Sequence, residues 1–278
     1  MHGEDGMMLT EQRATIGATW GGSDWGIHVS SDVNYALGGW DAVTNGANTS
    51  AGVLSAKVYE AYASTDLMGY ANLTVGRQAL DYGSGAIISS NQFGTRSTWD
   101  LMKFDLGLDI ADITLGYASL NYGFADVADG GLGETKGTDM YINVNKADGD
   151  WSANLLYYKG TGTVGGDDLD DASAMGLDLA YGLMGGDLNL AASYNTNTGE
   201  YGEGDDADKL MAEDMLSIGA TYNVNEDMTV TANRTTYGEN GFDIDGTNMA
   251  GGWLDGGNMG YLGADDQDLN IGATYSMG

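Results

Sequence analysis

The most constraining feature of this chain is a repeated alternation of apolar side chains with small or polar ones, in stretches of about ten residues. In residues 175–181, for example, four apolar side chains alternate with Gly176, Asp178 and Ala180. Successive side chains of a β-strand point to opposite faces, so such a stretch forms a ribbon with one apolar face and one polar face. The alternation predicts an all-β protein. It leaves open whether the apolar face points to a core or to lipid.

The connections between these stretches alternate in length. Short breaks join the members of a pair, whereas every second connection is long, Gly-rich and acidic, at residues 36–52, 81–98, 123–138, 160–173, 197–215 and 238–268. Outer-membrane barrels have short turns on the periplasmic side and long loops outside. We predict 13 strands from the pattern: Ala14–Trp20, Trp25–Tyr35, Val53–Ser64, Tyr70–Leu80, Trp99–Leu108, Ile113–Tyr122, Asp139–Lys146, Trp151–Lys159, Ala174–Tyr181, Leu188–Thr196, Leu216–Asn223, Met228–Tyr237 and Leu269–Met277.

The side chains of the two faces favour a membrane barrel with a wet lumen. One face carries apolar runs such as Met102, Phe104 and Leu106, and Trp and Tyr cluster at strand ends, where membrane interfaces hold them. The other face is small and polar, as in Thr229, Thr231, Asn233 and Thr235. We therefore predict that residues 1–278 form a single transmembrane antiparallel up-and-down β-barrel, with short periplasmic turns and long acidic outer loops.

Single-chain bacterial barrels have an even number of strands, so we predict about 14 strands and allow 12 to 16. The additional strand would come from Met7–Arg13, from residues upstream of Met1, or from the long segment 238–268, around Gly252–Leu262.

The charge excludes some classes of partner. The chain has 41 Asp and Glu against 10 Lys and Arg, a formal net charge of −31. Such a chain repels nucleic acid and anionic lipid surfaces and attracts cations. It has no Cys, and no apolar run is long enough for a transmembrane helix. The expected setting is the outer membrane of a Gram-negative bacterium, with the lipid bilayer and lipopolysaccharide as partners and a homotrimer left open.

Residues 73–83, with Gly76-Arg77-Gln78 at the end of a strand and a Tyr-Gly loop after it, are followed by the segment Arg96–Asp105. Together with Val58–Tyr62 before them, they resemble the alginate-export family of outer-membrane porins. The resemblance covers about 50 residues and implies an outer-membrane barrel through which solutes pass. Members of that family are longer and have more strands, so this chain would be a short relative, and the polysaccharide does not carry over.

The same region concentrates positive charge. Four of the ten basic residues lie in three consecutive strands and their connecting loop, in a chain that is otherwise acidic. Charged walls select ions in channels, so we predict a pore-lining selectivity site. Its members are Lys57, Glu60, Arg77, Arg96, Asp100, Lys103 and Asp105. The alternative is structural: Arg77 and Arg96 pair with Glu60, Asp81, Asp100 or Asp105 and hold the wall rigid.

Loop 81–98 contains Ile87, Ile88 and Phe93, and apolar side chains in a loop need cover. An inward fold that narrows the pore would supply that cover.

Catalysis is not expected. Histidine occurs only at His2 and His28, and nothing identifiable completes a nucleophile and base pair around His28. The acidic loops offer closely spaced oxygen ligands for calcium, at Asp167, Asp168, Asp170 and Asp171 and at Asp243 and Asp245. None forms a complete EF-hand loop, and solvated negative loops are the commoner explanation. No cofactor is required, and calcium in the outer loops stays open.

The sequence thus predicts an outer-membrane porin for passive diffusion of ions and small hydrophilic solutes, among which anionic sugars or acids are candidates. The main alternative is a structural or interaction barrel whose acidic surface loops bind calcium. A soluble β-solenoid or adhesin is a third possibility.

Overall fold

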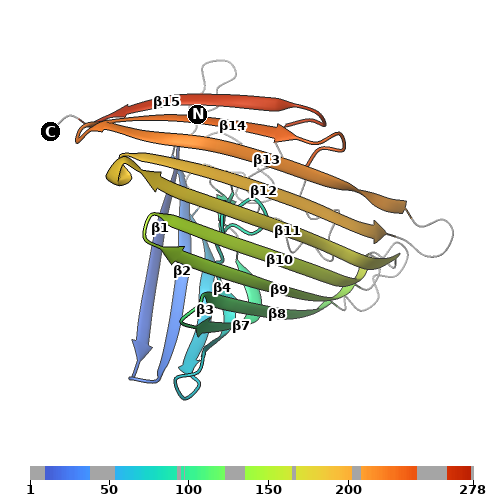
Figure 1. Ribbon diagram of the computed structural model, residues 1–278. Helices are drawn as coiled ribbons and strands as arrows, with labels where there is room; N and C mark the ends of the chain where they lie inside the picture. Colours follow the sequence, from blue (N-terminus) through green and yellow to red (C-terminus); the bar gives the residue numbers. More distant parts are fainter. Residues whose placement is uncertain are drawn as a thin grey trace.

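The computed structural model describes residues 10–37, 54–92, 95–96, 98–122, 135–164, 167–201, 208–242 and 262–276. These residues form one antiparallel sheet of 13 strands in which each strand pairs with the next along the chain, together with a two-stranded ribbon, β5–β6 (Figure 1). In Figure 1 the sheet curls, so that β1–β4 lie behind the wall formed by β9–β14. No helix among the described residues is long and apolar enough to cross a membrane.

The first strands of the sheet are β1 (Thr10–Gly21), β2 (Trp25–Leu37), β3 (Leu54–Asp66), β4 (Asn72–Gln78), β7 (Trp99–Gly107) and β8 (Asp112–Tyr122). The wall continues with β9 (Thr135–Asp148), β10 (Trp151–Val164), β11 (Asp167–Leu183), β12 (Leu188–Tyr201), β13 (Asp208–Asn225), β14 (Met228–Tyr237) and β15 (Gln267–Tyr275). The ribbon consists of β5 (Asn91–Gln92) and β6 (Thr95–Arg96). All 13 strands predicted from the alternation are confirmed, in the predicted order.

Two of the predicted long loops are largely strand. The ladder between β10 and β11 continues to the pair Val164 and Asp167, inside the predicted loop 160–173. Likewise, the ladder between β12 and β13 continues to Tyr201 and Asp208, inside the predicted loop 197–215. Backbone pairing therefore extends beyond the residues in which the apolar alternation can be read, because a ladder needs no apolar side chains.

One of the places predicted for the additional strand does not supply it. Residues Thr10–Arg13 belong to β1 itself, so Met7–Arg13 does not supply a separate strand. Of the other candidate, Gly252–Leu262, residues 252–261 lie outside the described residues. With 13 antiparallel strands in sequence, β1 and β15 run in the same direction, and the described residues show no pairing between them.

The two faces of the sheet are as predicted. The outward face carries large exposed apolar side chains, including Met102, Leu115, Leu155, Leu177, Leu190 and Leu216. The inward face is small and polar: one row of register partners crosses six strands from β9 to β14 as Asn145, Asn154, Asp178, Ser193, Ser217 and Thr235. Exposed apolar side chains outside and polar ones inside are the arrangement of a membrane barrel.

A β-bulge interrupts the alternation of β3. Ser30 pairs with Glu60 and Ser31 with Val58, so Tyr59 has no register partner. Such an extra residue shifts the strand by one position. As a result Lys57, opposite Asp32, and Glu60, opposite Ser30, both face the lumen, although strict alternation would place them on opposite faces.

The opposite faces can be tested with two adjacent alanines of β12. Ala192 pairs with Leu179 and Ile218 on the outward face, whereas Ala191 pairs with Ala180 and Gly219 on the inward face. We expect Ala192→Arg to lower the free energy of unfolding by about 2–4 kcal/mol, because it exposes a charge to lipid. Ala191→Arg should cost much less, because the lumen is wet. Denaturant unfolding in phospholipid vesicles measures both, and equal losses would contradict the assignment of the faces.

Candidate functional site

The segment between β4 and β7 folds into the lumen, and we call residues 79–92 the inward segment. At its start, the Ala79 amide donates to Glu60 Oε1 at 3.2 Å. Asp81 then closes the segment on itself, because its carboxylate accepts from the Ser90 amide at 2.8 Å and from the Ser89 and Ser90 hydroxyls. Ile87 and Ile88 are 1% and 2% exposed. The predicted inward fold of loop 81–98 is thus confirmed for these residues, whereas Phe93 lies outside the described residues.

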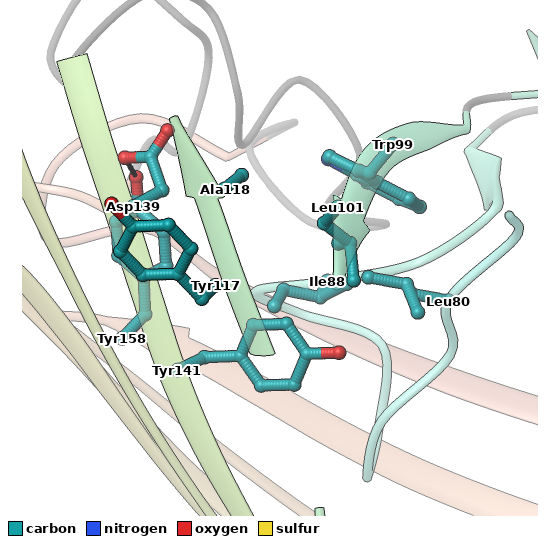
Figure 2. A pocket seen from close by; sticks show the side chains of 9 residues that line it. All are labelled: Leu80, Ile88, Trp99, Leu101, Tyr117, Ala118, Asp139, Tyr141 and Tyr158. Carbon is teal, nitrogen blue, oxygen red and sulfur yellow. Dashed lines mark hydrogen bonds between the residues drawn. The ribbon is translucent and has the colours of Figure 1, made fainter. Parts of the chain in front are cut away.

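Apolar contacts hold one side of the inward segment against the barrel wall. Figure 2 shows Leu80 and Ile88 beside Trp99 and Leu101 of β7, with the Tyr141 ring approaching from β9. The gap left among these side chains is about 10 Å³, which is no larger than one water molecule. The barrel therefore has its apolar core inside the lumen, where the chain folds back on its own wall.

Tyr141 reaches the segment because Gly116 lies opposite it on β8. A Cβ at Gly116 would lie 1.9 Å from Tyr141 Cε1, so only glycine leaves room for the ring. The Tyr141 hydroxyl hydrogen-bonds the Tyr82 hydroxyl at 2.9 Å. Burial raises the pKa of Tyr82, so this phenol stays protonated and keeps its hydrogen bond over the physiological pH range.

The tip of the inward segment touches the far wall. Ser193 Oγ on β12 donates to Ser84 Oγ at 2.9 Å, and Asn195 Nδ2 donates to Ser193 Oγ at 2.8 Å. Gly83 lies over β11: a Cβ there would lie 1.8 Å from Asp178 Oδ2, and its φ of +55° also favours glycine. The segment therefore reaches from β4 to β11 and β12 and narrows the lumen.

Beneath this tip lies a hollow of about 420 Å³ in the inner face of β9–β14. Of the described residues that line it, Asp178 alone carries a charge; the polar ones include Asn154, Ser193, Ser217 and Asn233. Two buried acceptors, Asp178 Oδ1 and Asn154 Oδ1, have no hydrogen-bond partner among the residues that the structure describes. The volume falls in the range of small-molecule sites.

Arg96, one of the predicted pore residues, is held on the opposite wall. Its Nη1 donates to Asp32 Oδ1 at 2.8 Å and to Thr15 Oγ1 at 2.6 Å, and its guanidinium lies 3.5 Å from the centre of the Tyr59 ring. The Asp32 side chain is fully buried, whereas that of Arg96 is 25% exposed. Arg96 thus pairs structurally, as the alternative reading expected, but with Asp32 rather than with one of the acids named for it.

Three other predicted pore residues face the lumen beside Lys57. Lys103 Nζ lies 3.0 Å from Asp105 Oδ2, and both share the inward face of β7 with Leu101. Glu60 Oε2 lies 3.6 Å from His28 Nε2. Lys57 is exposed on the same wall. The structure therefore brings Lys57, Glu60, Lys103 and Asp105 to the lumen near Arg96, and their selectivity role stays a prediction.

Arg77 and Asp100 lie on the other face, which corrects their predicted place in the pore wall. They are register partners and share the faces of Val75 and Met102, two of the exposed apolar side chains outside. Arg77 Nη2 donates to Asp100 Oδ2 at 2.6 Å and Arg77 Nε to Oδ1 at 3.0 Å. The pairing of Arg77 with Asp100 that the structural alternative named is confirmed. The alternation with Leu73 and Val75 already indicates this outward orientation.

His28 faces the lumen with Ser30 and Asp32, in a group that sequence reasoning missed. Its Nδ1 lies 2.9 Å from Thr19 Oγ1, and its ring stacks on Tyr62 at 5.1 Å. The order Thr19, His28, Glu60 resembles a hydroxyl, imidazole and carboxylate series. However, the 3.6 Å between His28 and Glu60 exceeds a hydrogen bond, so the carboxylate does not orient the ring.

The calcium prediction is not tested by the described residues. Asp167, Asp168, Asp170 and Asp171 have their backbone in β11 rather than in a loop, and Asp243 and Asp245 lie outside the described residues. Among the residues that the structure describes, no group of three or more His, Cys, Asp or Glu side chains could hold a metal ion. Asp266 Oδ2 accepts from the Gly263 amide at 3.0 Å and so stabilises a turn.

A disulfide can test the contact at the tip of the inward segment. Because the chain has no cysteine, Ser84→Cys with Ser193→Cys introduces two thiols at positions whose hydroxyls are 2.9 Å apart. We expect the disulfide to form under mild oxidation, detected by peptide mass spectrometry. Ser84→Cys with Ser23→Cys, at the first turn, is the control and should leave both thiols free. Free thiols in the first pair would contradict an inward tip.

The ion pair between Arg96 and the buried Asp32 leads to a second prediction for this site. Arg96→Met leaves the Asp32 carboxylate buried without its cation, and we expect the free energy of unfolding to fall by about 3 kcal/mol. Lys103→Met, which breaks a more exposed pair on the same face, should cost at most about 1 kcal/mol. Denaturant unfolding compares the two. A smaller loss for Arg96→Met than for Lys103→Met would show that the Asp32 pair does not hold the wall.

Comparison with known proteins shows the fold. No protein-family model matches the chain, and no curated protein matches its sequence. Among solved structures, it is similar to OccK8 (OprE) of Pseudomonas aeruginosa, with a TM-score of 0.60 and 13% identity over 95% of this chain and 73% of that one. OmpF of Salmonella typhi, in complex with daunomycin, has a TM-score of 0.54 and 13% identity over 95% of this chain and 89% of that one.

A third similar structure is the outer membrane channel DcaP of Acinetobacter baumannii, with a TM-score of 0.51 and 12% identity over 81% of this chain and 66% of that one. None of these findings bears on the alginate-export family, and that resemblance stays a prediction. The chain has the antiparallel β-barrel fold of outer-membrane porins.

Proposed function

We propose that this protein is a porin of the bacterial outer membrane, through which ions and small hydrophilic solutes diffuse passively. The observation that carries the proposal is the narrowed but polar lumen: residues 79–92 cross it, and a hollow of about 420 Å³ remains beneath their tip. A barrel filled by its own side chains would leave no such space. The porin fold of the similar structures supports the same conclusion.

The charges of the lumen favour cations. Arg96 is paired with Asp32 and Lys103 with Asp105, so these basic groups carry little uncompensated charge. Asp178, by contrast, lines the hollow, and none of the described residues that line it with Asp178 is basic. Anionic sugars or acids, which the basic strip suggested, therefore have weaker support than cationic and neutral solutes. The charge of −31 for the whole chain adds to the attraction for cations.

The proposal also covers the membrane around the barrel and its association with other copies. The outward apolar face fits a lipid bilayer, with lipopolysaccharide as the partner of the outer leaflet. A homotrimer is consistent with small outward side chains on β1 and β3, namely Ala14, Ala18, Ala61 and Ala63, which permit close approach of another copy.

No catalytic role is proposed. The alternative of a structural barrel with calcium-binding acidic loops has no observation among the described residues in its favour.

Single-channel recording in a planar bilayer tests this function. With a tenfold KCl gradient we expect steady open steps and a reversal potential on the cation-selective side. Lys103→Ala should move the reversal potential further toward cations, because it leaves Asp105 without its partner. Arg77→Ala is the matched control: it removes the same charge from the outward face and should leave the reversal potential unchanged.

Absence of conductance from folded protein inserted in the bilayer would overturn the porin function. A shift caused by Arg77→Ala as large as that caused by Lys103→Ala would contradict the assignment of selectivity to the lumen-facing residues.

A further inference from the structure

We propose that the hollow beneath the inward segment is a binding site for small primary ammonium compounds, with Asp178 as the group that holds the cation. The inference deepens the proposed diffusion function and rests on it, because it names a class of solute that the lumen retains in passing. The site lies in the inner face of β10–β12, roofed by Gly83 and Ser84 of the inward segment.

Two acceptors in the wall of the hollow lack donors among the described residues. Asp178 Oδ1 and Asn154 Oδ1 belong to register partners on neighbouring strands, and both atoms are buried without a partner in the described part of the chain. Buried acceptors without donors are costly, and a ligand that brings donors relieves that cost. An ammonium group carries three donors and a positive charge, and its hydrogen bonds to a carboxylate are strengthened by the charges.

Gly83 and Ser84 of the roof cover the Asp178 carboxylate at one end of the hollow. Gly83 approaches so closely that a Cβ would lie within 3 Å of both Asp178 Oδ2 and Asn154 Oδ1. Ser84 and Ser193, hydrogen-bonded to each other, add hydroxyl oxygens to the lining. The carboxylate is therefore shielded from the open lumen on its upper side, and shielding strengthens its attraction for a cation.

A patch of small side chains lies on one side of the carboxylate. Ala180 follows Asp178 on the inward face of β11, and its register partner Ala191 leads on to Gly219 of β13. These small side chains leave room for a short carbon chain beside the ammonium end. None of the described lining residues is basic, which disfavours carboxylates and phosphates. A single carboxylate also makes a poor site for divalent metals, which take several charged oxygens.

Butylammonium is a suitable probe, and butyrate, of similar length and opposite charge, is its control. The full chain is titrated with each in detergent by calorimetry, and each is added to the protein conducting K⁺ in a bilayer. We expect butylammonium to bind and to reduce the current, and butyrate to do neither. Asp178→Asn should raise the half-blocking concentration of butylammonium at least about tenfold, the loss expected for one charged hydrogen bond.

Asp112→Asn is the matched variant, because it removes one carboxylate from the inward face of β8 outside the hollow. It should change the half-blocking concentration less than twofold. The site would be overturned if butylammonium had the same half-blocking concentration for the wild type and Asp178→Asn. It would also be overturned if Asp112→Asn raised that concentration as much as Asp178→Asn. Ala180→Leu, which fills the hollow and keeps the charge, serves if Asp178→Asn does not fold. It should abolish butylammonium binding, and unchanged binding would overturn the site.

The two readouts separate the site from the function on which it rests. Conductance that butylammonium reduces equally with and without Asp178 leaves the porin intact and removes the site. Calorimetric binding that depends on Asp178, in folded protein that inserts into the bilayer without conducting, supports the site and removes passive diffusion.

Discussion

A backbone that crosses a bilayer must satisfy its amides and carbonyls within the protein, and every other feature of this barrel follows from that requirement. The continuous ladder from β1 to β15 supplies the partners. Once the backbone is committed to the ladder, side chains can only alternate between lipid and lumen. Most apolar side chains go outward, and along rows such as that from Asn145 to Thr235 the inward face carries small polar groups that cannot form a core by themselves.

The inward segment completes a core with the apolar side chains that the wall turns inward. Leu80, Ile87 and Ile88 bring apolar surface into the lumen, where Trp99 and Tyr141 can cover it. The polar tip lies elsewhere, against β11 and β12, and there the contacts are few and directional. Anchoring and solute contact are therefore separated: the apolar end fixes the position of the segment, and the polar end shapes the space through which solutes pass.

Period-two alternation predicted the strands of the sheet, because lipid on one side and water on the other impose it on each strand independently. The same alternation places Arg77 on the outward face, two residues after Val75, although the clustering of basic residues indicated the pore. No local pattern in the sequence marks the bulge at Tyr59. Strict alternation places Lys57 and Glu60 on opposite faces, so their common inward orientation could not be derived from the alternation. The hollow depends on contacts such as that of Ser84 with Ser193, 109 residues apart, which no local pattern encodes.

The bulge at Tyr59 gives β3 an unusual property. The strand consists of two segments of opposite phase, joined at one residue, while β2 and β4 keep an unbroken pairing elsewhere along it. Because Val58 and Glu60 already pair with the adjacent residues Ser31 and Ser30, deleting Tyr59 leaves every other side chain of β3, including Lys57, on its present face and requires no other strand to change. At this joint the wall can therefore shorten by one residue without exchanging water for lipid around any remaining side chain, whereas a deletion elsewhere in β3 would reverse the faces of the residues on one side of it.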